Sequence, residues 1–267
     1  MVGTLAVIIP IYGMHEFTSA LIQDLMHQAC DFDVYVVDNL GDYVTDTADI
    51  ITLTPGSNLG WAGGCNYALE NALARGYDQF MLLNNDTQLS PSFVSGMLEG
   101  SRQVRANVMG PSYDHNWPQQ RLTYSGPAEL YKPRSIEARV PFIDGTCMMI
   151  SRATLDRVGM LDTSIWPQFG WGCDKDYCLR VRSAGGNVWV TQRSYLNHIG
   201  RGTAAGLPGF SEVAAECEND DGMARKWGEA WKDLLYEGFE SISRLGPVQQ
   251  RLTGSQPLPN YPTGSTS

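Results

Sequence analysis

The stretch Phe80-Met81-Leu82-Leu83-Asn84-Asn85-Asp86-Thr87 joins four apolar residues directly to a polar run. A short, unbroken apolar run is typical of a strand that is buried on both faces, as in a parallel sheet. Ligand sites in open α/β sheets lie outside the carboxyl ends of such strands. Asn84, Asn85 and Asp86 follow that end, so we expect them to face a ligand. A carboxylate flanked by amide oxygens can hold a divalent cation against a phosphate.

The composition indicates a folded α/β protein. The chain has 267 residues, 43% of them hydrophobic and 18% charged, which suits one large α/β domain or two small ones. Its formal net charge of −10 makes nucleic acid or an anionic membrane a poor default partner. The six cysteines form no C-x-x-C pair, which argues against a zinc or redox motif and favours reduced cysteines in a cytoplasmic protein. The start of the chain lacks a basic leader and no apolar run approaches about 18 residues, so we expect no signal peptide and no transmembrane segment.

Strand and helix patterns alternate along the first part of the chain. We expect strands at 5–12, 34–37 and 50–53 and a helix at 15–29. Residues 58–66 read as a Gly-rich loop that runs into a helix at 67–75, which Gly76 ends, and the next helix begins at Ser90-Pro91. This strand–helix–strand order predicts right-handed crossovers.

The second part of the chain is less regular. Residues 107–140 are rich in Pro, Tyr and Arg and are expected to be irregular. A buried run at 146–150 precedes a helix at 152–158 that Ser151 caps. A helix at 174–184, a strand at 188–190 and mostly helical structure at 211–243 follow, and residues 255–267 are expected to form a mobile tail.

Six segments follow one another along the chain: the strand at 7–12, Val36-Val37-Asp38-Asn39, Asn58-x-Gly60-Trp61-Ala62-Gly63-Gly64-x-Asn66, Leu82-Leu83-Asn84-Asn85-Asp86-Thr87, Asp144-Gly145-Thr146-Cys147-Met148-Met149-Ile150 and Cys173-Asp174-x-Asp176-Tyr177-Cys178-Leu179-Arg180. Taken in this order, they resemble family 2 glycosyltransferases of the GT-A fold, and most of all their rhamnosyl- and galactofuranosyl-transferase-like branch. The resemblance covers residues 7–228 and includes His198 and Lys226-Trp227-Gly228.

The resemblance implies an α/β fold of the GT-A (nucleotide-diphospho-sugar transferase) type, with a mostly parallel central sheet flanked by helices. Residues 1–235 would form a single glycosyltransferase domain, with a nucleotide-sugar half at about 1–105 and an acceptor half at about 106–235. Residues 236–267 would form the end of a C-terminal helix and a flexible tail.

The resemblance also implies the chemistry: an inverting enzyme that moves a sugar from a nucleoside-diphosphate sugar of the UDP or dTDP type to an acceptor hydroxyl. Asp86 and His198 are the expected ligands of Mn²⁺ or Mg²⁺, and the imidazole favours Mn²⁺. Asp174 and Asp176 are the catalytic candidates, Asp174 as general base and Asp176 as the residue that orients the loop or the acceptor. Gly145 and Trp171 are the acceptor candidates. The residues expected to contact the nucleotide-sugar are Pro10, Tyr12, Asp38, Asn58, Gly64, Asn66, Asn84 and Asn85.

Each candidate also has an ordinary structural explanation. Asp86 can be a turn former and Asp174 a helix cap. Asp176 can pair with Arg180 four residues on, and His198 can be a surface histidine. The chain departs from the family pattern twice: the metal motif has a single acid, and Cys173 stands where an acid often precedes the catalytic aspartate.

Two alternative functions remain open at this stage. A sugar nucleotidyltransferase usually carries a Gly-rich loop with Arg or Lys after its first strand, but residues 11–16 contain no Arg or Lys. A non-catalytic nucleotide-sugar-binding protein of the same fold is compatible with the single-acid motif. The acceptor class is open among glycan, lipid-linked glycan, protein, small molecule and modified nucleobase, and so is the oligomeric state.

Overall fold

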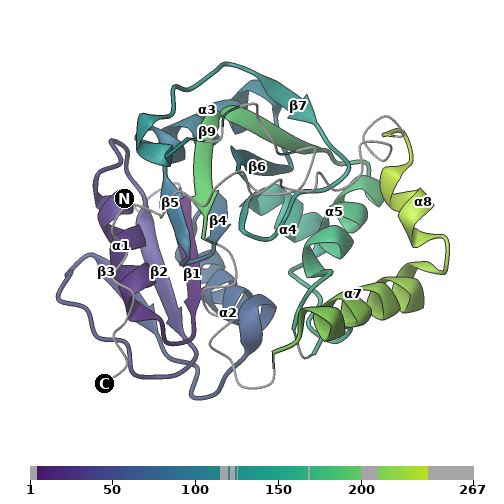
Figure 1. Ribbon diagram of the computed structural model, residues 1–267, viewed down its shortest axis with the longest axis horizontal. Helices are drawn as coiled ribbons and strands as arrows, with labels where there is room; N and C mark the ends of the chain where they lie inside the picture. Colours follow the sequence, from purple (N-terminus) through teal and green to yellow (C-terminus); the bar gives the residue numbers. More distant parts are fainter. Residues whose placement is uncertain are drawn as a thin grey trace.

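The computed structural model describes residues 5–114, 120, 124, 126–167, 169–199 and 210–239 (Figure 1). Its strands are β1 (Leu5–Ile11), β2 (Asp33–Asp38), β3 (Ile50–Leu53), β4 (Gln79–Leu83), β5 (Thr87–Leu89), β6 (Val108–Tyr113), β7 (Glu137–Arg139), β8 (Cys147–Ser151) and β9 (Val188–His198). Its helices are α1 (His15–Met26), α2 (Gly60–Arg75), α3 (Phe93–Val104), the short 3₁₀ helix η1 (Ala128–Leu130), α4 (Arg152–Val158), α5 (Cys173–Ser183), α7 (Glu212–Trp227) and α8 (Trp231–Tyr236). The expected mobile tail at 255–267 lies outside the described residues.

One nine-stranded sheet of order β3-β2-β1-β4-β8-β6-β9-β5, with β7 also paired to β9, organises the described residues. The strands β3, β2, β1 and β4 pair in parallel, as their apolar runs predict. Beyond them, β8 is antiparallel to both β4 and β6, while β9 is parallel to β6 and antiparallel to β5 and β7. The predicted α/β fold with a central sheet flanked by helices is confirmed, and the sheet is mixed because parallel pairing predominates only on the β1 side.

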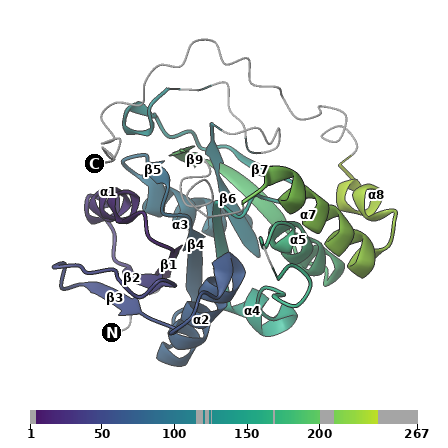
Figure 2. The same cartoon turned by 60° about the horizontal axis from the view of Figure 1, so that its bottom comes forward.

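Helices cover both faces of this sheet. Alternate residues of β1 divide between two hydrophobic cores, with Ala6 and Ile8 on one side and Leu5, Val7 and Ile9 on the other. The first core packs against α2, α4, α5, α7 and α8, and the second against α1 and α3. Figure 2 shows α2 and α4 together on one side of the sheet. None of the helices in the described ranges is both long and apolar enough to cross a membrane.

The Gly-rich segment before residue 67 is helical rather than a loop, because α2 already begins at Gly60. Two amides support this start: Asn58 Oδ1 accepts from Gly60 N at 2.8 Å, and Asn39 Oδ1 accepts from Leu59 N at 3.0 Å. A Cβ at Gly64 would lie 3.1 Å from both Pro10 Cβ and Asn39 Nδ2. The small residues therefore serve close packing of the α2 N-terminus on the end of β1.

The segment expected to be irregular contains β6, and the strand expected at 188–190 extends to His198. Gly110 and Pro111 read as strand breakers, yet β6 is held between β8 and β9, and the register shifts between Pro111 and Ser112. The polar centre of β9 is stabilised by ion pairs, since Arg193 bonds Glu137 at 2.7 Å and Glu99 at 2.8 Å. Tertiary pairing overrides the local signals here.

A buried carboxylate fastens α7 to α5. Asp176 is 0% exposed, and its two carboxylate oxygens accept from Arg180 Nε at 2.9 Å, Lys226 Nζ at 3.0 Å and Trp227 Nε1 at 2.9 Å. Lys226 also pairs with Asp162 at 2.5 Å. Burial raises the pKa of Asp162, but hydrogen bonds from Lys226 and Ser164 outweigh this effect and lower the pKa to about 2.

Replacing Lys226 with methionine should destabilise the fold. The change removes the α7 cation that neutralises Asp176, and the loss of a hydrogen bond to a charged group costs about 2 kcal/mol. Urea unfolding at pH 7 measures this free energy.

Lys232→Met is the matched control, since the Lys232–Asp220 pair is largely exposed at 63% and 51%. Such surface pairs contribute about 0–1 kcal/mol. Equal effects of the two substitutions would contradict the role given to Asp176.

Candidate active site at one edge of the sheet

The strand directions bring several polar segments to one edge of the sheet. Strands β4, β6 and β9 run the same way and β8 runs against them. The ends of the first three and the start of β8 therefore meet at the carboxyl edge, where ligands bind in such sheets. The segments at that edge are Asn84–Asp86 after β4, Asp114 after β6, His198 at the end of β9 and Asp144–Thr146 before β8.

Asp86 and His198, the two predicted metal ligands, lie side by side. Thr87 of β5 pairs with His198 of β9, and this register places His198 Nε2 3.3 Å from Asp86 Oδ1. Both side chains are buried, with exposed fractions of 13% for His198 and 7% for Asp86. Asp114 holds the strand end in place, since its Oδ1 accepts from the His198 backbone N–H at 3.0 Å.

Thr146 and Asp144 hold the other nitrogen of this imidazole. The Thr146 hydroxyl donates to Asp144 Oδ1 and lies 3.3 Å from His198 Nδ1. A hydroxyl that donates to a carboxylate accepts from the imidazole, so Nδ1 carries the hydrogen. In neutral His198 the lone pair of Nε2 then faces the Asp86 carboxylate.

Two facing acceptors need a positive charge between them, and either a proton or a metal ion can supply it. Burial alone would lower the pKa of His198, but the hydrogen bond and charge of Asp86, followed by the charges of Asp144 and Asp114, raise it above its ordinary value. Two ligands at right angles, each about 2.1 Å from one cation, are about 3.0 Å apart, close to the Asp86–His198 distance. The pair therefore fits a divalent cation.

The protein supplies only part of such a coordination shell. Within the described ranges, no group of three or more His, Cys, Asp and Glu side chains is arranged to hold a metal ion. A cation at Asp86 and His198 would take its remaining ligands from substrate or water.

Asp174 reaches the same edge from the first turn of α5. Its Oδ2 accepts from the Gly145 backbone N–H at 3.1 Å, and its Oδ1 accepts from Lys175 N at 2.8 Å. Desolvation raises the pKa of Asp174 and the charge of Asp144 adds to this, against the opposing effect of Lys175. Gly145, which bonds Asp174, is followed in the chain by Thr146, which contacts His198. One turn of backbone therefore links Asp174 to the Asp86–His198 pair.

Trp61 is part of this edge, although it was not among the predicted site residues. Its Nε1 donates to Asn84 Oδ1 at 2.8 Å, and its ring atoms lie 3.1 and 3.2 Å from where a Cβ on Gly145 would be. Asn84 and Gly145 are therefore joined by one indole. The signal in the sequence was a tryptophan in an otherwise small-residue segment.

Asp144, Thr146 and Asp114 were not predicted as site residues either. Asp144 and Thr146 lie two residues apart in the fifth of the six segments given above. At this spacing an Asp side chain can accept a hydrogen bond from the nearby backbone. Here Asp144 Oδ1 accepts from the Thr146 N–H at 2.9 Å. Asp114 had no usable signal, because β6 was not recognised as a strand.

Three of the predicted site residues also make contacts within the protein. The Asp38 carboxylate accepts from the backbone N–H groups of Leu40, Gly41 and Tyr43 at 2.8–3.0 Å, so it holds the loop after β2. The Asn66 amide bonds both the N–H and the C=O of Leu161. Asp176 lies in the buried network described above and orients α5.

Two further asparagines also bond the protein. Asn85, 4% exposed, donates to Thr18 Oγ1 at 3.1 Å and so ties the end of β4 to α1. Asn58, which is exposed, caps the start of α2 through Gly60.

The remaining candidates flank the edge. Pro10 lies in β1 and pairs with Val37 of β2. The half-buried Tyr12 follows directly after β1. Trp171, also half-buried, belongs to an aromatic group in which Phe210 is 6.2 Å from Trp171 and 5.8 Å from Phe169, measured between ring centroids. Glu218 of α7 accepts from Phe169 N at 2.8 Å and thereby fixes this loop.

Comparison with known proteins identifies the family. The sequence model described as "Glycosyl transferase family 2" matches residues 6–159, more than half of the chain. The chain belongs to glycosyl transferase family 2. The matched residues of this glycosyltransferase include β1 to β8 and the Asp86 and Asp144–Thr146 segments.

The chain is also similar to two sets of known proteins, curated relatives and solved structures. Proteins of Mycobacterium tuberculosis and Mycobacterium bovis, both named "uncharacterized protein", are 39% identical over 201 residues, covering 75% of this chain and 76% of theirs. The structure of GalNAc-T7 with UDP, GalNAc and Mn²⁺ aligns with a TM-score of 0.62 and 13% identity over 91% of this chain, which spans only 54% of that one. The structure of S. aureus TarS with UDP aligns with a TM-score of 0.52 and 13% identity, covering 84% of this chain and 72% of that one. At this identity the structural likeness shows the fold.

Gly145→Ala should disturb the edge, because the new methyl group would press on the Trp61 indole at 3.1 Å. Overpacking of this kind costs about 1–3 kcal/mol. Urea unfolding measures the cost, and tryptophan fluorescence reports the displaced ring.

A double-mutant cycle with Trp61→Phe tests the contact itself, since phenylalanine lacks the indole atoms that approach Gly145. The cost of Gly145→Ala should shrink in the Trp61→Phe background. Additive effects would show that the strain arises elsewhere.

Proposed function

We propose that this protein is an inverting, metal-dependent glycosyltransferase that moves a hexosyl or deoxyhexosyl group from a nucleoside-diphosphate sugar to an acceptor hydroxyl. The observation that carries the proposal is the continuous set of contacts from Asp86 through His198, Thr146 and Asp144, with Gly145 bonded to Asp174. It supplies a place for a cation and a carboxylate at one edge of a family 2 fold.

Asp174 is the proposed general base. Inversion requires a group that removes the proton of the acceptor hydroxyl as this oxygen attacks the sugar. The Asp174 carboxylate is held by two backbone N–H groups and its pKa is raised by desolvation, so it is a stronger proton acceptor than an ordinary aspartate. Gly145, whose backbone N–H bonds this carboxylate, is the proposed acceptor contact.

Asp86 and His198 are the proposed holders of Mn²⁺ or Mg²⁺. When bound, a divalent cation supplies the positive charge that stabilises a leaving nucleoside diphosphate. The Thr146 hydroxyl positions the imidazole by accepting from Nδ1–H, the kind of outer contact that sets the orientation of a ligating histidine.

The donor is proposed to carry UDP or dTDP. UDP occupies the related structures of GalNAc-T7 and TarS, and the first also contains Mn²⁺. The proposed nucleotide-sugar contacts are the residues predicted from the sequence, among them Tyr12 beyond β1 and Asn84 after β4. Within the family, the rhamnosyl- and galactofuranosyl-transferase-like branch and the division into a donor half and an acceptor half near residue 105 remain parts of this proposal.

Loss of the metal ligand should abolish turnover. Asp86→Ala is expected to lower Mn²⁺-dependent hydrolysis of the preferred sugar nucleotide by about 100-fold or more, because the leaving charge is no longer neutralised. A panel of UDP- and dTDP-sugars, each with and without Mn²⁺, measures this and identifies the donor.

Thr146 gives a subtler test of the same site. Thr146→Val should weaken Mn²⁺ binding, measured by electron paramagnetic resonance in the presence of UDP, by about 10–100-fold, whereas Thr146→Ser keeps the hydroxyl and should bind normally. Equal Mn²⁺ affinity in all three proteins would remove the role given to Thr146, and normal turnover by Asp86→Ala would remove the metal site.

Asp174→Asn should lower transfer by about 100- to 10,000-fold while sugar-nucleotide binding is kept. In the unaltered protein the base acts only when ionised, so kcat/KM should fall as pH decreases through the Asp174 pKa. That fall should be centred above the ordinary carboxyl value of 3.8, since the pKa is raised.

Loss of binding together with loss of turnover would contradict the base role. Pyrophosphate release from a nucleoside triphosphate and a sugar phosphate would favour a nucleotidyltransferase instead. Binding of sugar nucleotides without any turnover would favour a binding protein of the same fold.

A further inference from the structure

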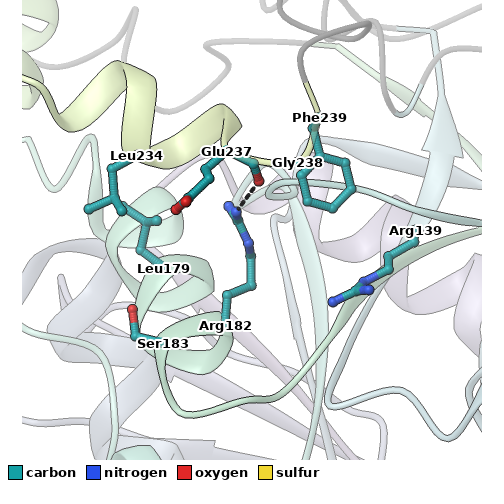
Figure 3. A pocket seen from close by; sticks show the side chains of 8 residues that line it. All are labelled: Arg139, Leu179, Arg182, Ser183, Leu234, Glu237, Gly238 and Phe239. Carbon is teal, nitrogen blue, oxygen red and sulfur yellow. Dashed lines mark hydrogen bonds between the residues drawn. The ribbon is translucent and has the colours of Figure 1, made fainter.

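A cavity of about 380 Å³ lies away from the candidate active site, between the end of α5, the end of α8 and β7 (Figure 3). Its lining combines the apolar residues Leu179, Leu234 and Phe239 with the cations Arg139 and Arg182 and the acid Glu237. In Figure 3 the two leucines lie on one side of Arg182, and Phe239 and Arg139 lie on the other. Small-molecule pockets in proteins measure about 300–1,000 Å³, so the space suits an organic ligand rather than a single small ion. Arg182 lies eight residues after Asp174 on α5, which separates the two by about 12 Å along the helix.

Arg182 is held in the wall by neutral groups. Its guanidinium donates to the carbonyl oxygens of Pro141 at 3.2 Å, Leu235 at 2.6 Å and Glu237 at 3.0 Å. The Phe239 ring centroid is 5.1 Å from its Cζ. These contacts fix the orientation of the guanidinium, and all three acceptors are neutral carbonyl groups.

Arg139 adds a second positive charge to the same space. In Figure 3 its side chain points from β7 into the cavity, toward the α5 wall. Burial lowers the pKa of Arg182, and the charge of Arg139 adds to this effect, while Cys178 and Glu237 oppose it. The Glu237 carboxylate is the nearby acid, and in this view it lies on the Leu234 side, away from Arg139.

The two guanidiniums therefore form a positive cavity on a chain whose net charge is −10. Among the residues that the structure describes, neither Arg139 nor Arg182 makes an ion pair with a carboxylate. Guanidinium groups attract anions, and their planar donors match the geometry of phosphate oxygens.

We propose that this cavity binds the phosphate group of an organic phosphate, with Arg139 and Arg182 contacting the phosphate oxygens and the apolar part of the lining contacting the organic part. The site is separate from the donor site, which uses Asp86 and His198 at the sheet edge. It does not depend on the glycosyltransferase activity proposed above.

Calorimetric titration with inorganic pyrophosphate and with glucose 1-phosphate, both in EDTA to exclude metal-dependent binding at the donor site, tests this inference. Arg139 is exposed, so Arg139→Ala should fold normally and weaken both ligands at least tenfold. The matched control is Lys132→Ala, which removes an equal charge from an exposed position that does not line the cavity.

Asp86→Ala separates this site from the donor site. The expected result is unchanged affinity in Lys132→Ala and Asp86→Ala and weakened affinity only in Arg139→Ala. Unweakened binding by Arg139→Ala, weakened binding by Asp86→Ala, or no binding of either ligand at millimolar concentration would overturn the proposal.

Discussion

The antiparallel pairing of β8 with β4 is the constraint on which the candidate site depends. Leu83 pairs with Cys147, and the Asn84 N–H donates to the Thr146 carbonyl at 2.9 Å. This register places the Asp144–Thr146 turn beside the Asn84–Asp86 segment, although about 60 residues separate them in the sequence. A shift by one residue would turn Met148 and Met149, which now belong to opposite cores, to the wrong faces. Packing of the sheet therefore fixes the geometry of the site.

The same edge concentrates negative charge. Asp86, Asp114 and Asp144 all act on His198, and their combined effect raises its pKa despite burial. Asp144 and desolvation likewise raise the pKa of Asp174. Neighbouring carboxylates repel one another, so this cluster lowers the free energy of unfolding when no cation is present. Clusters with perturbed pKa values are common at sites that bind charged ligands. The large cores on both faces of the sheet can offset this cost.

Helix α5 connects the parts of the molecule that lie beyond the sheet. Its first turn presents Asp174 to the site, while Asp176, two residues on, is buried and bonded to α7. Its last turn carries Arg182, which bonds the carbonyl groups at the end of α8. Movement of α7 and α8 would therefore shift α5 and with it Asp174, the proposed general base. In Figure 1, α7 and α8 lie on the α5 side of the molecule, far from β3 and α1.

The sequence by itself determined the family, the α/β class, most helices and the segments that carry the site, because apolar runs and the polar residues after them are local patterns. It predicted one site for Asp86, His198 and Asp174, and the structure brings these residues to one edge. It could not show that Asp38, Asn66 and Asp176, also predicted as site residues, make hydrogen bonds within the protein. Only the tertiary structure decided the mixed sheet, the strand β6 with Asp114, and the roles of Trp61, Asp144 and Thr146. These features depend on which groups meet across long distances in the chain, since an amide or carboxylate has the same local signature whether its partner is a substrate or a backbone N–H.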